Sequence, residues 1–363
     1  MKILLFGEYS GLANCLKDGF VALGHEVFLA SDGNRYRDFP SDFRWDAHTN
    51  GKLGKFHAPF CAANIWMHIN CFSGYDVVLL MAPNYISTHK WLNAPIYNYI
   101  LKNNKKVYLS GAGMMGISFD YWHDSLTKYH SYTSGYFEDN PNPVWYHNDR
   151  LKEWENYLMQ QVVGYIPIWY EYAEPFRTFT SCRKTIRIPI NSSKFEYKAN
   201  KLYDGKIVFY HGATRACKGT RFIRPAFEKM QQKYGDKAEF ICAEKLPFKE
   251  YMEVVEKTNI IVDDANSYSI AMNGLFSLLK GKLIMGGAEP LGNKELGIEG
   301  VNPVFNINPD VDQICSVIEE IMSRKDEIEE IGLQGRKFVE KYHNYIDICK
   351  QYIDLFEKDL NKG

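Results

Sequence analysis

One stretch in the second half of the chain carries the residue types that bind phosphate. It reads HGATRACKGT and ends at Thr220. Arg215 offers a planar fork of donors to oxygen atoms, and Lys218 offers a compact positive charge. Gly212 and Gly219 let the backbone approach an anion closely. A helix that begins at Thr220 would add unpaired N–H groups, so the stretch predicts a diphosphate site. A solvated turn with Thr220 as the helix cap is the alternative.

A second polar stretch, DDANSYSIAMNG, begins at Asp263. Small and polar residues at a helix start, Ser269 among them, can present N–H groups to sugar hydroxyls or to a phosphate. Asp263 and Asp264 lack the further ligands that a metal site needs, and capping of the strand end is the alternative. The pair Asp310 and Asp312 precedes a helical pattern, and helix capping explains it better than metal binding. We therefore expect no metal site.

Two further positions in the first half are candidates. Gly7 begins a short loop, GEYSG, that can pass close to an acceptor or a phosphate, although a plain tight turn is equally consistent with it. The loop is not G-x-G-x-x-G, so a nicotinamide dinucleotide is disfavoured. His123 can contact a sugar hydroxyl or act as a base, and a structural histidine is the alternative. His130 and His147 show no metal-binding spacing.

Alternating short apolar runs and helical patterns must position these loops. In the first half we expect strands over Lys2–Phe6, Glu26–Ala30, Asp76–Met81, Lys106–Ser110 and Thr185–Ile190. Helices are expected between them over Ala13–Leu23, Trp91–Lys102 and Asp149–Val162. In the second half the expected strands are Lys206–Tyr210, Lys237–Cys242, Asn259–Asp263, Lys282–Met285 and Pro303–Asn306. The expected helices there are Thr220–Tyr234, Pro247–Lys257, Met272–Lys280 and the stretch from Asp312 onward. Such alternation predicts α/β domains with parallel sheets, whose ligands bind beyond the carboxyl ends of the strands.

The pattern restarts after a polar join, NSSKFEYKANKLYDG, which suggests two domains. We expect an N-terminal Rossmann-like acceptor domain over 1–190 and a C-terminal Rossmann-like donor domain over 191–340. Residues 341–363 are expected to form a helix that packs back on the first domain. Two such domains facing each other would form a cleft walled by strand-to-helix loops.

Composition narrows the function classes. The chain has 363 residues, and its 45% apolar and 24% charged residues are ordinary for a soluble globular protein. Lysine and arginine number 43 against 44 aspartates and glutamates, which disfavours a duplex nucleic-acid binder. Eight cysteines without a C-x-x-C pair indicate free thiols in a reducing compartment. The absence of a signal peptide and of a long apolar run predicts a cytoplasmic protein, with peripheral contact at the inner face of a membrane left open.

Aromatic residues make up 15% of the chain and concentrate between Phe119 and Phe179. Aromatic rings stack on the C–H faces of sugars, so this density suits carbohydrate recognition. Core packing explains it as well.

These motifs resemble the retaining glycosyltransferases of the GT-B fold, above all family 4 (group 1) of bacterial polysaccharide and lipopolysaccharide assembly. The likeness runs through MKILLFGEYS with LGHEV, RIPINSS, HGATRACKGT, TNIIVDD and GLFSLLKGKLIMGG. It implies transfer of a sugar from a nucleoside-diphosphate sugar to a glycan or lipid-linked acceptor, with retention and without a metal or cofactor. The resemblance assigns the donor diphosphate to Lys218 and Arg215, although Arg215 stands two places later than the family's arginine. It assigns further donor contacts to Ser269, Met272 and Asn273. We expect the donor to be bound as well by Gly7, Gly212, Gly219, Thr220 and Asp263.

One departure from that family bears on activity. The family carries two glutamates eight positions apart, and Tyr268 and Phe276 stand at those places here. Asn273 or Glu289 substitutes for them, or the donor is held differently, or the protein no longer catalyses. Two alternatives therefore remain beside a transferase: a sugar-nucleotide epimerase of the same fold, and a non-catalytic binding subunit.

Overall fold

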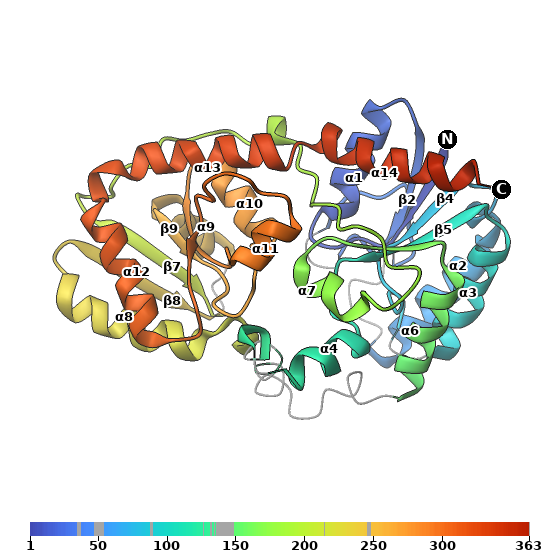
Figure 1. Cartoon of the computed structure of the whole chain (residues 1–363), viewed down its shortest axis with the longest axis horizontal. Coiled ribbons are helices and arrows are strands. Elements are labelled where there is room, and N and C mark those ends of the chain that lie inside the picture. The colour runs from blue at the N-terminus through green and yellow to red at the C-terminus, as the bar shows by residue number, and fades with distance from the viewer. Residues whose placement is uncertain are drawn as a thin grey trace. The chain divides into compact units, whose positions relative to one another are not determined.

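The computed structural model divides the chain into two compact units (Figure 1). It describes residues 1–34, 38–46, 54–87, 90–125, 127–130, 133, 135, 149–213, 215–244 and 248–362, without the side chains of 55, 248, 249, 251 and 252. Within these residues, unit 1 comprises the parts of the chain in 1–119, 144–191 and 343–363. Unit 2 comprises those in 120–143 and 192–342. The acceptor and donor roles expected for the two halves stay predictions.

Unit 1 is built on a six-stranded parallel sheet in the order β3-β2-β1-β4-β5-β6. Its strands are β1 (Lys2–Phe6), β2 (Glu26–Ser31), β3 (Phe43–Arg44), β4 (Val77–Leu80), β5 (Lys106–Gly111) and β6 (Gly164–Pro167). The central strands β1 and β4 are almost wholly buried, as expected of a parallel sheet covered on both faces.

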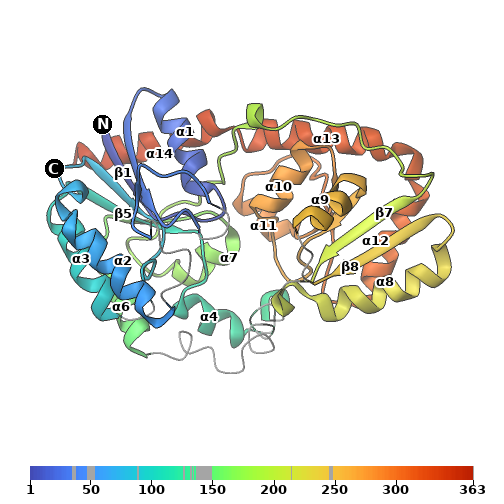
Figure 2. The ribbon, with the colours of Figure 1, turned by 180° about the vertical axis from the view of Figure 1, so that it is seen from behind.

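Helices cover both faces of this sheet. One face packs against α2 (His57–Met67), α3 (Lys90–Lys102) and α6 (Asp149–Gln161), which lie side by side in both views (Figures 1 and 2). The C-terminal helix α14 (Tyr345–Leu360) packs on α1 (Leu12–Ala22) and contacts β5. Shorter elements complete the unit: α4 (Gly116–His123), which continues into unit 2, α7 (Tyr170–Ala173), and the 3₁₀ turns η2 (Gly54–Phe56), η3 (Ile69–Phe72) and η4 (Glu174–Phe176).

Unit 2 has a five-stranded parallel sheet in the order β11-β10-β9-β7-β8. The strands are β7 (Ile207–Gly212), β8 (Ala238–Ala243), β9 (Ile260–Val262), β10 (Leu283–Gly286) and β11 (Phe305–Asn306). The helices are α8 (Thr220–Tyr234), α9 (Phe248–Lys257), α10 (Met272–Leu279), α11 (Pro290–Glu295), α12 (Val311–Ser323) and α13 (Ile328–Tyr342). Three 3₁₀ turns accompany them: η5 (Ser192–Lys194), η6 (Ala216–Lys218) and η7 (Lys325–Glu327). The buried core of this unit joins the β7, β9 and β10 strands to α8 and α12.

The α/β prediction is confirmed, with parallel sheets in both units and helices at the C-terminal end. The strand expected over Thr185–Ile190 is wrong. The last strand of the sheet is β6, and the chain after it makes only scattered bonds with it, such as Ile186 N to Pro167 O. Pro189 has no N–H to donate, so this stretch cannot continue a regular ladder.

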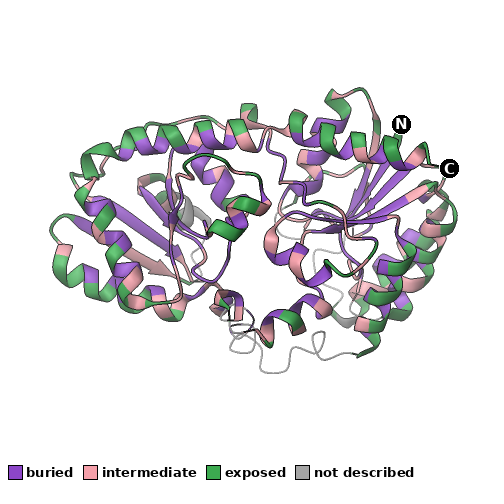
Figure 3. Cartoon of the chain, in the orientation of Figure 1, coloured by how far each residue is buried: buried purple, intermediate pink, exposed green. Residues whose placement is uncertain are grey.

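None of the helices in the described parts of the chain is long and apolar enough to cross a bilayer. The helices of both units have a buried side and an exposed side (Figure 3).

Candidate functional site

The phosphate-type loop follows β7 directly. A 3₁₀ turn, η6, carries Lys218, and Gly219 then adopts a left-handed conformation with φ of 81°. A side chain at Gly219 would also place its Cβ 2.9 Å from Ala265 Cβ, so the position requires glycine. The 15-residue helix α8 begins at Thr220, and no side chain caps its N-terminus. Its first N–H groups therefore retain the partial positive charge that attracts anions.

A buried histidine, His211, holds the start of this helix. His211 Nδ1 lies 2.8 Å from Val262 O and must donate to it, because a carbonyl only accepts. Its Nε2 lies 2.8 Å from the hydroxyl oxygen of Thr220. Burial lowers the pKa of His211 to about 4, so the ring is neutral at pH 7 and its Nε2 accepts a hydrogen bond from the Thr220 hydroxyl. The N-cap residue is Gly219 and not Thr220. No role for His211 was predicted from the sequence.

An ion pair joins the two stretches that sequence reasoning singled out. Lys218 Nζ lies 2.7 Å from Asp263 Oδ1, and their side chains are 30% and 5% exposed. The Asp263 charge raises the pKa of Lys218. Two further bonds tie the loops, from Ala265 N to Lys218 O at 3.2 Å and from Asn266 Nδ2 to Cys217 O at 2.6 Å. The structure therefore brings the expected phosphate loop and the expected donor loop into one site.

The second aspartate, Asp264, shapes its own loop. Its carboxylate accepts from Asn266 N at 2.8 Å and from Ser267 Oγ at 2.9 Å. Burial and the neighbouring Asp263 charge raise the pKa of Asp264 to about 6. At pH 7 two carboxylates therefore stand beside Lys218, and Arg215, which is exposed on the same loop, adds a second cation. This site is balanced in charge, and it becomes more cationic as the pH falls through 6.

The loop that begins at Asp263 ends at helix α10, where the side chain of the N-cap residue Ala271 makes no capping hydrogen bond. Ser269 and Met272 are buried there, and Asn273 is exposed. A Cβ at Gly292 would lie 2.7 Å from Ser269 Oγ, so the backbone of α11 lies against this loop. Ser269 and Met272 can act only through their backbone groups or after a rearrangement, whereas the Asn273 side chain is accessible.

A segment from the first half of the sequence packs on this site within unit 2. A Cβ at Gly135 would lie 2.4 Å from Cys217 Cα, so the backbones of the segment and of the phosphate loop touch. The rings of Trp122 and Tyr129 lie 5.9 and 6.4 Å from the ring of Tyr268. Tyr268 stands where the family that the sequence resembles has a glutamate, and aromatic packing fills that place here.

A partly buried ion pair anchors the same segment. Lys128 Nζ donates to Glu289 Oε1 at 3.0 Å and to Ile307 O at 2.6 Å. Asn306 Nδ2 also donates to Glu289 Oε1, at 2.8 Å. Glu289, considered as a substitute for a family glutamate, thus has one oxygen engaged within the protein. Lys128 was not predicted as a site residue. The signal that could have identified it is a charged residue within an aromatic-rich stretch.

His123 belongs to this segment too. It is the last residue of α4, and its ring stacks on that of His130 at 5.6 Å. His130 Nδ1 lies 2.7 Å from His123 O. A role for His123 in sugar contact or proton transfer stays a prediction, and His147 lies outside the described residues.

In unit 1, the loop after β1 holds a buried carboxylate of its own. Glu8 accepts from the N–H groups of Gly11, Ala13 and Asn14 at 2.8 to 3.3 Å. Burial raises the pKa of Glu8, and these bonds oppose that shift. Gly7 has φ of 110°, and a Cβ there would lie 2.7 Å from the ring of Tyr85. Glu8 thus already occupies the start of the helix that follows, and the Gly7 assignment stays a prediction.

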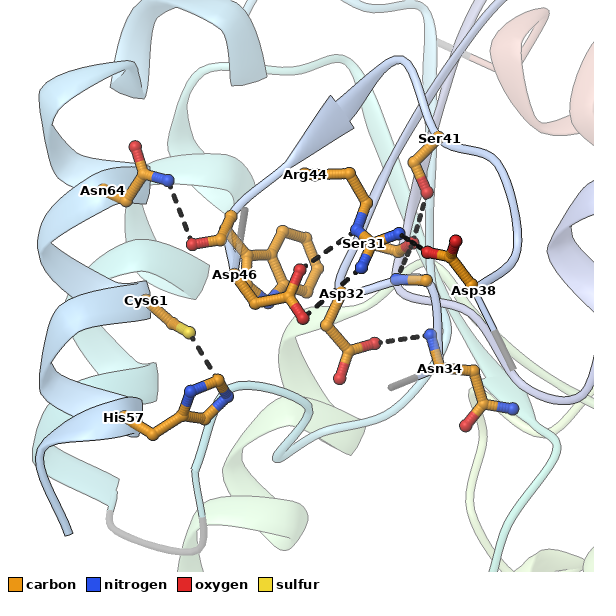
Figure 4. A network of polar contacts seen from close by, with 12 residues as sticks. Ser31, Asp32, Asn34, Asp38, Ser41, Arg44, Asp46, His57, Cys61 and Asn64 are labelled. Carbon is orange, nitrogen blue, oxygen red and sulfur yellow. Dashed lines mark hydrogen bonds and ion pairs between the residues drawn. The ribbon is translucent and has the colours of Figure 1, made fainter. Parts of the chain in front are cut away.

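A polar network lines the ends of β2 and β3 beside that loop (Figure 4). Asp32 Oδ1 accepts from Asn34 N at 2.9 Å and from Tyr85 Oη at 2.8 Å. Arg44 donates to Asp46 at 3.0 Å and to Asp38 at 2.8 Å. Sequence reasoning missed this network because its residues come from loops with no recognisable motif.

The remaining expectations concern metal ligands and thiols. Asp310 Oδ1 accepts from Gln313 N at 2.8 Å and caps α12, so the capping interpretation is confirmed for Asp310. Asp312 lies in the first turn of α12 and pairs with Lys229. All eight cysteines are free thiols. No cluster of three or more His, Cys, Asp or Glu residues suited to a metal occurs in the part of the chain that the structure describes.

Comparisons with known proteins give similarity in structure only. No protein-family model matches the sequence, and no curated protein matches it. Sucrose-phosphate synthase from Thermosynechococcus elongatus is similar over 100% of both chains, with 14% identity and a TM-score of 0.66.

Two further solved structures are similar over almost the whole length of the chain. Anabaena Alr3699/HepE in complex with UDP-glucose is similar over 99% of this chain and 100% of its own, with 11% identity and a TM-score of 0.60. UDP-GlcNAc 2-epimerase from Neisseria meningitidis covers the same shares at 11% identity, with a TM-score of 0.52. With two parallel α/β sheets and similarity along its whole length, the chain has the GT-B fold of glycosyltransferases.

Proposed function

We propose that the protein is a glycosyltransferase of the hexosyltransferase class. It moves a sugar from a nucleoside-diphosphate sugar to a hydroxyl of a glycan or a lipid-linked acceptor in the cytoplasm. The observation that carries the proposal is the uncapped N-terminus of α8, flanked by Lys218 and Arg215 on one loop. Helix N-termini with adjacent cations bind phosphate groups. HepE, which shares the fold, has been solved with UDP-glucose, and a uridine diphosphate sugar is our first candidate donor.

The site suits stabilisation of a leaving diphosphate. In the reaction the bond from the anomeric carbon to the β-phosphate oxygen breaks, and a bond to the acceptor oxygen forms. Negative charge grows on the diphosphate as it leaves, and Lys218, Arg215 and the N–H groups at Gly219 and Thr220 are proposed to stabilise it there. Gly212 lets the backbone approach the same phosphates.

A retaining reaction on one face of the sugar needs no enzyme base. The leaving phosphate takes the proton of the acceptor hydroxyl, so charge and protons balance without a metal or cofactor. We propose that Ser269, Met272 and Asn273 contact the donor, with Asp263 orienting Lys218. The Gly7 loop is proposed to face the acceptor, and His123 to contact a sugar hydroxyl.

Donor consumption tests the proposal. The protein is incubated with a panel of nucleoside-diphosphate sugars and candidate glycan and lipid-linked acceptors, and release of nucleoside diphosphate is followed. Lys218→Ala should lower kcat/KM about 100-fold, the scale of losing one transition-state donor. Lys229→Ala is the matched control, because Lys229 lies exposed on α8 and pairs with Asp312. Equal turnover by the Lys218 and Lys229 variants would remove the assignment.

An epimerase is the second candidate, since one similar structure is a UDP-GlcNAc 2-epimerase. Asp263 and Asp264 are adjacent carboxylates that such a reaction could use. Incubation with a nucleotide sugar alone separates the two, because an epimerase converts it without an acceptor. A non-catalytic binding subunit is the third, and thermal shift with nucleoside diphosphates addresses it, because bound ligand raises the melting temperature.

A further inference from the structure

A segment that begins in α4 lies along the carboxyl edge of the unit 2 sheet. Its described residues, which we call the inserted segment, are 120–125, 127–130, 133 and 135. They belong to unit 2, although the residues before 120 and after 143 in the sequence belong to unit 1. In open parallel sheets, ligands bind at the carboxyl edge. The inserted segment therefore lies where the donor is proposed to bind.

The inserted segment packs on two loops of this edge through apolar contacts. After β7, a Cβ at Gly135 would lie 2.4 Å from Cys217 Cα. After β9, the rings of Trp122 and Tyr129 lie 5.9 and 6.4 Å from the ring of Tyr268. The hydrophobic attraction between such groups is non-directional, so these contacts hold the segment on the edge without fixing its register.

Lys128 supplies directional contacts to two further loops. Its Nζ donates to Glu289 Oε1 at 3.0 Å and to Ile307 O at 2.6 Å, and its side chain is only 9% exposed. Glu289 follows β10 as the N-cap residue of α11, and Ile307 directly follows β11. A shift of the segment would separate a poorly hydrated cation from both partners, which is costly. Lys128 therefore fixes the register of the inserted segment.

Glu289 connects Lys128 to the loop that follows β9. The backbone N–H of Glu289 donates to Tyr268 O at 3.0 Å. A Cβ at Gly292, in the first turn of α11, would lie 2.7 Å from Tyr268 O and from Ser269 Oγ. The start of α11 thus lies against the backbone of this loop without space between them. Because closely packed groups transmit small displacements, a movement of Glu289 would change the loop at Tyr268 and Ser269.

The phosphate loop is held by a different set of bonds. Lys218 Nζ lies 2.7 Å from Asp263 Oδ1, and His211 Nε2 lies 2.8 Å from the Thr220 hydroxyl. These bonds set the start of α8, where the diphosphate is proposed to bind. A change at Lys128 should therefore affect the part of the site near Ser269 more than the part that binds the diphosphate.

We propose that Lys128 is a positioning residue for the sugar part of the donor. It acts through Glu289, which keeps the backbone at Tyr268 and Ser269 in the shape that the donor sugar contacts. A residue from the first half of the sequence thereby sets the geometry of the donor site in the second half. The inference rests on the proposed function, because that function places the donor at Ser269.

Calorimetry with UDP and with UDP-glucose tests the proposal. Lys128→Met should raise the Kd of UDP-glucose about tenfold and that of UDP less than about threefold, because only the sugar part loses its positioned loop. Lys128→Arg keeps the charge and the donors, and should recover most of the affinity. Lys294→Met is the matched control, because Lys294 lies exposed on α11. It should leave both affinities unchanged.

A double variant tests the route through Glu289. Lys128→Met/Glu289→Gln should bind UDP-glucose about as weakly as the weaker of the two single variants, because each substitution removes the same contact. Losses that add in the double variant would show that Lys128 does not act through Glu289, and would overturn the inference.

Hydrogen exchange without any nucleotide separates this inference from the proposed function. In Lys128→Met the backbone amides of 263–271 should exchange faster than in wild type, whereas Lys294→Met should leave them unchanged. A wild-type protein that binds neither ligand removes the proposed function, and exchange then still tests the hold of Lys128 on the loop. Unchanged exchange in Lys128→Met, or equal losses of affinity for UDP and UDP-glucose, overturns the inference.

Discussion

Lys218 Nζ lies 2.7 Å from Asp263 Oδ1, so the lysine expected to bind a phosphate already has a partner within the protein. The pair holds the lysine beside the start of α8, where an anion would bind. The pair also makes binding of an anion less favourable, because the Asp263 carboxylate repels it. The two effects can be separated, since the lysine has a structural role in the ion pair and a proposed role in binding the ligand.

Replacing Lys218 should affect stability as well as binding. Lys218→Met leaves Asp263, only 5% exposed, without its cation. We expect a loss of about 1–2 kcal/mol in the free energy of unfolding, below the range for fully buried pairs because Lys218 is partly exposed. Lys218→Met/Asp263→Asn should recover part of that stability, measured by urea unfolding. Affinity for UDP-glucose, measured by calorimetry, should stay low in both variants. Wild-type affinity in the double variant would show that the anion does not need Lys218.

Asp264 should make donor binding depend on pH. Its pKa of about 6 means that it is charged at pH 7.5 and mostly neutral at pH 5.5. UDP-glucose has no phosphate proton to lose in this range, so a change in affinity reports on the protein. Asp264→Asn should tighten binding about threefold at pH 7.5, because one repelling charge is removed, and have little effect at pH 5.5. Asp236→Asn, at an exposed position of unit 2, is the control. An equal gain in UDP-glucose affinity at both pH values would contradict the role given to the Asp264 charge.

Most of the fold could be predicted because the elements carry strong local signals. The expected helix Thr220–Tyr234 and strand Lys2–Phe6 match the observed α8 and β1. Helix α2 was not predicted, because apolar residues on both of its sides remove the helical period on which the prediction depends. Strand β6 was missed because it is only four residues long and contains glycine and proline.

The candidate site could be predicted only in part. Lys218 follows an expected strand and Asp263 ends another, so both loops could be identified from the sequence. The hydrogen bond between these residues, which are 45 positions apart, leaves no local pattern. The role of His211 depends on burial and on two partners, Val262 and Thr220, that only the folded sheet brings together. The contact of Gly135 with the phosphate loop is likewise a tertiary relationship.

His211 should make unit 2 sensitive to acid. Its pKa is lowered from 6.5 to about 4 by burial, so the unfolded chain binds the proton more readily than the folded one. The stability that this group contributes is complete above pH 6.5 and is lost as the pH falls towards 4. Between pH 7 and pH 5 the loss should be about 2 kcal/mol.

Urea unfolding of wild type and His211→Gln at both pH values measures this effect. The variant should be less stable at pH 7 but should lose less on acidification. Asp264 acts in the opposite sense, because its raised pKa favours the folded state at low pH, so the difference between the two proteins is the informative quantity. Gln232→Ala, at an exposed position of α8 that carries no titratable group, should keep the wild-type slope. Parallel slopes in wild type and His211→Gln would contradict the role of the buried ring.

Gly135 should matter for binding although it is distant in sequence from the phosphate loop. A methyl group there would lie 2.4 Å from Cys217 Cα and 2.6 Å from Cys217 N, so the segment or the loop must move. Gly135→Ala should weaken UDP-glucose binding about tenfold or more, because small displacements of a positioned anion site are costly. Gly113→Ala is the matched control, since its nearest neighbour, Tyr9 Oη, would be 3.5 Å away. Calorimetry gives the affinities, and circular dichroism checks the fold. If both variants bind like wild type, the segment around Gly135 does not support the site.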